Sequence, residues 1–176
     1  LNDCYSCGNI ACFKHPGSRI IRPGKSRTTY VLDEKWQEYD RYISEHAGES
    51  DVMIIPLKKN SFIPTHRYSW TVKNPASLRT TSRAAIYRAI RQRWAVRRGE
   101  NVFSVLLDMD RLVAKSAAAL VPVESTHLVV AQNLLPYLWK EGVLGGRTYD
   151  VLMSRMPMEK LHQRLDDAFR QHPESN

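Results

Sequence analysis

Residues 125–155 read STHLVVAQNLLPYLWKEGVLGGRTYDVLMSR, the most strongly patterned stretch of the chain. Residues 128–131 (LVVA) form an apolar run with β-branched members, which is typical of a strand buried on both faces. A helix is expected after Asn133, and residues 149–153 (YDVLM) are a second strand candidate. A strand, a helix and a second strand in this order predict a parallel sheet.

The helix expected between these strands has recognisable ends. Asn133 can cap its start, and Pro136 falls in its first turn, where a missing N–H costs little. Gly142 suits the left-handed position that follows a last helical turn. Its apolar side is expected to consist of Leu134, Leu135, Leu138 and Trp139.

Strands and helices are predicted to alternate along the rest of the chain. Strands are expected at residues 28–32, 51–56 and 66–72, and helices at residues 33–46, 74–98, 102–120 and from 157 onward. The whole pattern predicts an α/β fold, a Rossmann-like layered domain with a parallel sheet over residues 28–176. Residues 1–27 are expected to form a small, basic, metal-stapled region beside it.

Two of the predicted helices carry specific expectations. Asp33 is expected to cap the helix at residues 33–46. In the helix at residues 74–98, an apolar stripe at i, i+4 and i+8 is expected to face the core, and two arginines that point away from it are expected to reach solvent or a partner. The stripe consists of Ile86, Ile90 and Trp94, and the arginines are Arg88 and Arg91.

All three cysteines lie within the first twelve residues. Cys4, Cys7, Cys12 and His15 place four metal ligands in one short segment, which favours a structural zinc site with a closed tetrahedral shell. A disulfide with one free thiol and a cysteine-ligated iron–sulfur site are the alternatives. The odd number of cysteines and the lack of a recognisable export signal argue against a disulfide framework.

Positive charge is concentrated in the first part of the chain. Residues 1–100 hold 18 Lys and Arg against 9 Asp and Glu, a net charge of +9, whereas residues 101–176 hold 8 against 9 and carry −1. This asymmetry suggests an anionic partner, either nucleic acid, a phosphorylated sugar donor or anionic lipid head groups. The alternative is a surface charge that only keeps the protein in solution.

Composition and chain ends set further expectations. With 43% apolar and 25% charged residues, the 176-residue chain is typical of a globular protein, and no apolar run is long enough to cross a bilayer. No secretory signal is recognisable, so a cytoplasmic location is expected. The chain starts with Leu1 rather than Met and stops in a linker-like Pro-Glu-Ser-Asn sequence, which suggests a fragment of a longer protein.

Residues 103–175 resemble the N-terminal, acceptor-side part of certain bacterial glycosyltransferases of the class with two Rossmann lobes (GT-B). The resemblance lies in THLVVAQNLLPYLW at 126–139, GVLGGRTYDVLM at 142–153 and RMP at 155–157, followed by Leu161, Leu165-Asp166 and HPES at 172–175. It implies transfer of a sugar from a nucleotide-activated donor to an acceptor, with no metal at the reaction centre. In such enzymes the donor binds mainly to a C-terminal lobe, which this chain lacks and which must be supplied in cis or in trans.

Substrate-binding candidates follow from their positions in the strand–helix–strand unit. Gln132 and Asn133 lie where a strand end meets a helix start and can hydrogen-bond sugar hydroxyls. Gly145 and Gly146 allow close approach of the backbone, and Arg147 can meet a phosphate. The alternatives are a helix cap for Asn133, an ordinary turn for the two glycines and a surface position for Arg147.

His127 and Asp150 are the catalytic candidates, as acid–base groups. Each lies beside an apolar strand, so a hydrogen-bonded structural role is the alternative. A second function also stays open for the whole chain: a zinc-stapled basic module that binds nucleic acid or another anionic partner.

Overall fold

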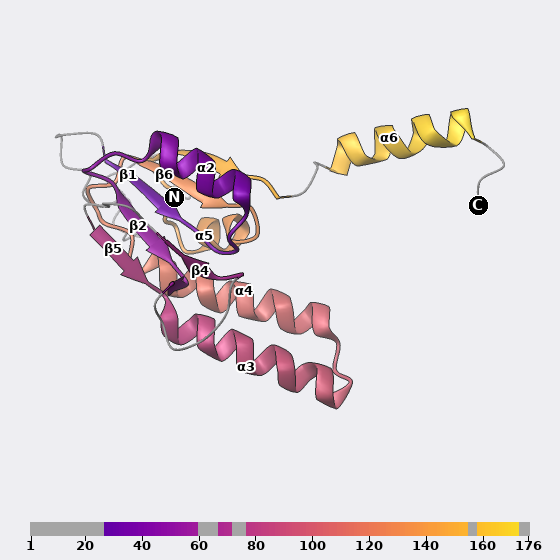
Figure 1. The fold of residues 1–176 in the computed structure, drawn as a ribbon, viewed down its shortest axis with the longest axis horizontal. Coiled ribbons are helices and arrows are strands. Elements are labelled where there is room, and N and C mark those ends of the chain that lie inside the picture. The colour runs from indigo at the N-terminus through magenta and orange to yellow at the C-terminus, as the bar shows by residue number, and fades with distance from the viewer. Residues whose placement is uncertain (1–26, 60–66, 72–76, 155–157, 173–176) are drawn as a thin grey trace, which may run out of the picture.

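The computed structural model describes residues 27–59, 67–71, 77–154 and 158–172 (Figure 1). Five parallel strands form its main sheet, in the order β5-β2-β1-β6-β7. The strands are β1 (Thr28–Val31), β2 (Val52–Ile55), β5 (Ser77–Thr80), β6 (His127–Ala131) and β7 (Thr148–Leu152). The predicted strand–helix–strand unit is confirmed, because β6 and β7 are parallel and α5 (Leu135–Lys140) lies between them in the chain.

The strand order reverses direction at the centre of the sheet. The chain moves outward from β1 to β2 and β5, and then returns to place β6 on the other side of β1, with Val31 opposite Val130. This is the order of the first five strands of a Rossmann-like fold. In such sheets ligands bind in the crevice beyond the carboxyl ends of the two strands that flank the reversal, here β1 and β6.

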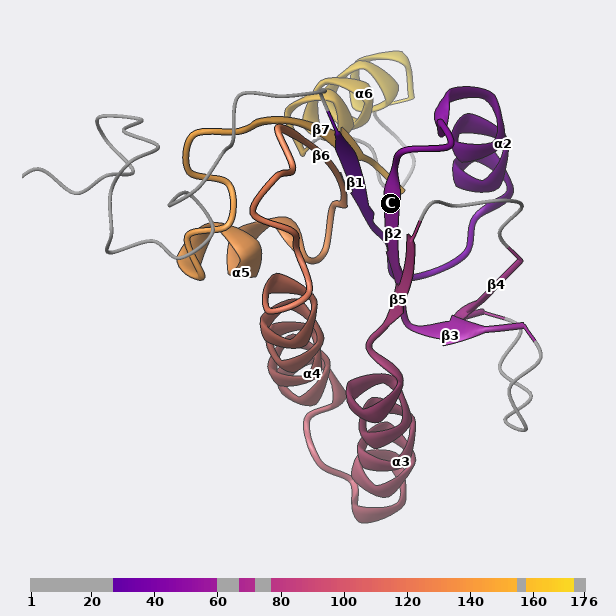
Figure 2. The same cartoon turned by 90° about the vertical axis from the view of Figure 1, so that its left-hand side faces the viewer.

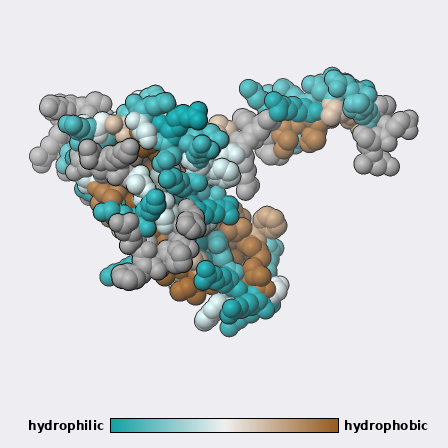
Figure 3. All heavy atoms as spheres, in the orientation of Figure 1, coloured by the Kyte–Doolittle hydropathy of each residue, from teal (hydrophilic) through white to brown (hydrophobic). Residues whose placement is uncertain are grey.

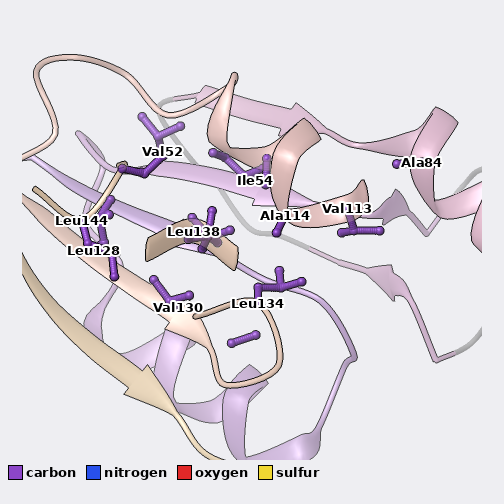
Figure 4. Close-up of a cluster of buried hydrophobic side chains, with 14 residues drawn as sticks. Val52, Ile54, Ala84, Val113, Ala114, Leu128, Val130, Leu134, Leu138 and Leu144 are labelled. Atoms are coloured by element: carbon purple, nitrogen blue, oxygen red, sulfur yellow. The ribbon is translucent and has the colours of Figure 1, made fainter. Parts of the chain in front are cut away.

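Helices cover both faces of the sheet (Figure 2). On one face, Tyr39 and Ile43 of α2 (Gln37–His46) pack in a cluster that includes Met53 and Val129. On the other, helices α4 (Val102–Ala118) and α5 cover a larger cluster (Figure 4). Residues 30–32, 52–55 and 128–130 alternate between the two clusters, which explains why these stretches are apolar on both faces of the sheet.

Helices α3 (Ser82–Arg98) and α4 form a hairpin beyond the carboxyl ends of the strands (Figure 2). Gly99 ends α3 with a positive φ of 66°, the left-handed conformation that favours glycine after a last helical turn. The Asn101 side chain caps α4 by accepting hydrogen bonds from the backbone N–H groups of Phe103 and Ser104 at 3.1 and 3.3 Å.

Two smaller parts complete the described structure. Strands β3 (Leu57–Lys58) and β4 (Ser69–Trp70) form a separate two-stranded sheet. Helix α6 (Met158–Gln171) extends away from the layered body, and its Leu161, Leu165 and Phe169 side chains are exposed (Figures 1 and 3). The predicted helix therefore exists, but its apolar side chains are not buried against the rest of the described chain.

Several expectations about the first half of the chain are wrong. Helix α3 starts at Ser82, because residues 77–80 form the edge strand β5 instead. Ile90 and Trp94 are exposed, and the buried face of α3 carries Arg88 among alanines. Helix α2 starts only at Gln37, so Asp33 does not cap it.

The predicted zinc ligands Cys4, Cys7, Cys12 and His15 lie outside the described residues, as does all but the last residue of the predicted 1–27 region. The strand expected at residues 66–72 falls partly outside them, and its described part contains only β4. Among the helices that the structure describes, none combines the length and apolarity needed to cross a bilayer.

Candidate ligand-binding crevice

A buried ion pair lies at the carboxyl end of β1. Asp33 follows β1 and is 1% exposed, and Arg88 of α3 is 2% exposed. The guanidinium donates two hydrogen bonds to the carboxylate, from Nη2 to Oδ1 at 2.5 Å and from Nη1 to Oδ2 at 2.9 Å. This two-point geometry is the strongest pairing that arginine and a carboxylate can make, and it fixes α3 to the end of the sheet.

Asp110 and Asn133 complete a polar network around this pair. Arg88 Nη1 also contacts Asp110 Oδ1 of α4 at 3.3 Å, and the Asn133 amide donates to Asp33 Oδ2 at 2.6 Å. The Arg88 guanidinium lies 4.1 Å from the centre of the Tyr68 ring, a cation–π contact. Asp33, Arg88, Asp110 and Asn133 thus bring together the ends of β1 and β6 and both helices of the hairpin.

Burial and charge shift the proton affinities in this network. Burial, reinforced by the nearby Asp33 carboxylate, raises the pKa of Asp110 to about 6, although Arg88 and Asn133 act in the opposite direction. For Arg88, burial alone would lower the pKa, but the hydrogen bonds and charge of Asp33 outweigh it and raise the pKa above its ordinary value. Asp110 therefore keeps its proton to a higher pH than an ordinary aspartate does.

A pocket of about 560 Å³ opens above the network, within the usual range for small-molecule sites. Its polar lining includes Gln92, Asp110, Gln132, Asn133 and Ser154. A Glu34–Arg67 ion pair of 2.8 Å also contributes to the lining. The pocket lies at the strand-order reversal, where the fold places ligands.

Gln132 and Asn133 lie where they were expected, after the carboxyl end of β6 and in the lining of this pocket. The alternative role of Asn133 as a helix cap is wrong. Leu134 occupies the cap position of α5 and no side chain caps it, while the Asn133 amide is directed to Asp33.

His127 lies at the amino end of β6, whereas Asn133 follows the carboxyl end of the same strand. Asp150 lies within the neighbouring strand β7. His127 starts β6, and its Nε2 atom lies 3.3 Å from Asp150 Oδ2 on β7. Its Nδ1 atom lies 2.8 Å from Thr148 Oγ1, at the start of β7. These two catalytic candidates contact each other, but neither lines the pocket.

Arg147 is buried, so the alternative of a surface position is wrong. It is 7% exposed and donates to the carbonyl oxygens of Ser125 and Val143 at 2.7 and 2.8 Å. Burial without a carboxylate partner lowers its pKa to about 10. Gly145 and Gly146 belong to the turn that precedes it, with a positive φ of 71° at Gly146, and the pocket lining includes none of the three.

The sequence interpretation missed Asp33, Arg88 and Asp110 as a group. The sequence pattern predicts a helix cap at Asp33 and an Arg88 that reaches solvent or a partner, and it gives no signal for Asp110. One signal was available: Asp33 directly follows an apolar strand, as Gln132 does, and parallel strands end at the same edge of a sheet. The α3 and α4 partners had no comparable signal, because their contact depends on how the hairpin packs.

The described residues contain no group of three or more His, Cys, Asp and Glu side chains arranged to hold a metal ion. No known protein family model matches the chain, and no curated protein or solved structure is significantly similar to it. The fold and the crevice thus define an α/β protein with Rossmann-like layering and a polar pocket at its strand reversal.

Proposed function

We propose that this domain is the acceptor-side lobe of a glycosyltransferase that uses a nucleotide-activated sugar. The observation that supports this function is the convergence of Asp110, Gln132 and Asn133 in one pocket at the carboxyl ends of β1 and β6. A carboxylate and two amides are suited to hydrogen-bonding the hydroxyl groups of a sugar or another polyhydroxylated acceptor. The residues 126–153 that resemble glycosyltransferases include β6, α5 and β7.

In this proposal Asp110 is the general base. Transfer requires an acceptor hydroxyl to lose its proton as its oxygen attacks the sugar carbon, and the nucleotide leaves with the bonding electrons. A carboxylate with a pKa of about 6 is mostly ionised at pH 7 and is a stronger base than an ordinary aspartate. Arg88 and Asp33 position it, while Gln132 and Asn133 orient the acceptor. His127 and Asp150, on this view, are structural.

The test uses the chain together with its native downstream sequence, supplied with a panel of nucleotide sugars. Asp110→Asn is expected to lower kcat about 100-fold or more with a smaller effect on KM, as loss of a general base does. Asp108→Asn is the matched control, because Asp108 is an exposed aspartate of the same helix. Absence of sugar transfer and donor hydrolysis with every donor would contradict the proposal, as would equal activity of the two variants.

A second function is supported by the exposed face of α3. Arg83, Tyr87, Trp94 and Arg97 follow one another at helical spacing and are exposed, and Arg98 lies 5.4 Å from the centre of the Trp94 ring. Cations and aromatic rings on one helix face can bind the phosphates and bases of single-stranded nucleic acid. Binding of a random oligonucleotide should weaken steeply with salt, and Arg97→Ala should reduce that salt dependence. Binding that is independent of salt would contradict this function.

The proposed zinc site belongs to this second function. The purified chain is expected to hold about one equivalent of zinc through Cys4, Cys7, Cys12 and His15. Cys4→Ser should lower that metal content, and metal analysis of both proteins decides the matter. A metal-free wild-type protein, purified without chelators, would contradict the site.

A further inference from the structure

The pocket lining combines polar and apolar side chains. Asp110, Gln132 and Asn133 are called here the polar floor, and Phe103, Leu106 and Leu107, in the first turns of α4, are called the apolar wall. The aromatic residues Trp36, Tyr39, Tyr68 and Tyr137 also contribute to the lining. Phe103, Leu107 and Asp110 are spaced at i, i+4 and i+7, so one face of one helix changes from apolar to ionisable over about 10 Å.

The apolar wall is open to solvent. Phe103 is 79% exposed and Leu107 is 58% exposed, although both line the pocket. Exposed apolar side chains that adjoin a polar pocket are typical of a ligand-binding surface. The neighbouring residues Val105 and Met109 of the same helix are buried in a separate cluster with Ala95, so Phe103 and Leu107 are not needed for the packing of α3 on α4.

Gln92 of α3 also lines the pocket. Its amide nitrogen is shielded from solvent and has no hydrogen-bond acceptor among the described residues, and such a buried donor costs free energy. The Gln92 side chain thus adds a polar group to the lining beside the first turns of α4.

We propose that the pocket takes an amphipathic acceptor, with a polyhydroxylated head group on the polar floor and an aliphatic or aromatic tail along Phe103 and Leu107. This inference rests on the proposed transferase function and names its acceptor class. A free sugar would satisfy the floor and leave the wall exposed to water. A tail of several methylene groups covers the wall, and the burial of its apolar surface adds affinity.

The first test compares three probes by calorimetry on the purified chain, all below their micelle-forming concentrations. The probes are octyl β-glucoside, methyl β-glucoside and 1-octanol. Octyl β-glucoside is expected to bind at least about tenfold more tightly than either of the others, because only it occupies both the polar floor and the apolar wall. Equal affinity of the two glucosides overturns the inference. It is also overturned if 1-octanol binds as tightly as octyl β-glucoside, which would identify a nonspecific apolar surface. Failure of all three probes to bind overturns it as well.

The second test uses a matched pair of variants. Leu107→Ser is expected to weaken octyl β-glucoside binding about fivefold or more and to leave methyl β-glucoside binding unchanged. Leu165→Ser on α6 is the control, because Leu165 is 57% exposed, like Leu107, but does not line the pocket. An equal effect of the two variants, or none from Leu107→Ser, overturns the inference.

The outcomes separate this inference from the proposed function. Sugar transfer to methyl and octyl glucosides with equal efficiency and equal affinity would leave the transferase function in place and remove the amphipathic acceptor. A tail-dependent affinity that Leu107→Ser abolishes, in a protein that transfers no sugar with its downstream sequence present, would retain the amphipathic site and remove the transferase.

Discussion

The guanidinium of Arg88 loses its hydration on burial, and the ion pair with Asp33 offsets the free energy of that loss. Each side chain is almost fully buried, and each provides the other's principal countercharge. Such a pair adds little net stability compared with apolar residues of the same size, but removal of one partner leaves a buried charge unpaired. Asp110, which is 16% exposed and 3.3 Å from Arg88, cannot replace Asp33 in the two-point geometry.

Arg88→Met is therefore expected to lower the free energy of unfolding by about 3 to 5 kcal/mol, because Asp33 would be left without its countercharge. The double variant Asp33→Asn, Arg88→Met should be more stable than Arg88→Met alone. Urea unfolding at pH 7 measures both, and Arg83→Met on the exposed side of α3 is the control, expected to change stability by less than about 0.5 kcal/mol. A double variant that is no more stable than Arg88→Met alone would contradict the coupling.

Asp110 gives stability a specific pH dependence. Its pKa in the folded protein, about 6, lies above its ordinary value of 3.8, so folding favours the protonated form. Its contribution is fully present below about pH 4 and is lost as the pH rises through 6, a change on the order of 2 kcal/mol.

Asp110→Asn should remove this contribution. The wild type should therefore lose stability relative to the variant as the pH rises from 4 to 8. Denaturant unfolding across this range tests the expectation. A difference that stays constant with pH, or shifts in favour of the wild type, would contradict the assigned proton affinity.

At the scale of elements, the start of α4 depends on one side chain. Asn101 accepts hydrogen bonds from two backbone N–H groups in the first turn, which have no partner inside the helix. Asn101→Ala should lower the free energy of unfolding by about 1 kcal/mol, and Asn101→Asp should retain most of the stability because aspartate also caps helices. Thermal or urea unfolding compares them, and equal losses from both substitutions would show that the cap is unimportant.

The elements that the sequence predicts well are those whose signal is local. β6 and β7 are marked by apolar runs, and α5 is marked by a proline in its first turn and by Gly142 after its end. All these features are present in the structure, with a left-handed conformation at Gly142. β5 was missed because SLRT at residues 77–80 is an edge strand that is nowhere fully buried and carries no apolar alternation. Its polar character matched a helix start after Pro75 equally well.

The face of α3 was predicted wrongly for a tertiary reason. Periodicity placed Ile90 and Trp94 in the core, but the small residues Ala84, Ala85 and Ala95 allow close packing and occupy the buried side. Arg88 shares that side because Asp33 neutralises it there. The sequence around an arginine does not indicate a partner 55 residues away, so the contribution of Arg88 and Asp110 to the candidate site could be found only from the structure.

At the scale of the molecule, the layered body and α6 are distinct. Every side chain that the structure describes in α6 is exposed, so the helix contributes little buried apolar area. Deletion of residues 155–176 is therefore expected to shift Tm by less than about 2 °C, since stability follows burial. Calorimetry on the shortened chain checks this expectation. A fall in Tm of more than about 5 °C would show that α6 packs against the body in solution.

The polar network at the strand reversal also has a kinetic consequence. Asp33 contacts partners 55 and 100 residues further along the chain, so the crevice can form only after both halves of the sheet have assembled around β1. Contacts of such long range close late, after most of the loop entropy has been lost. Interactions that are absent from the folding transition state slow unfolding and leave the folding rate nearly unchanged. We therefore expect this network to slow unfolding of the completed fold, and it cannot form on a growing chain before Asn133 has been synthesised.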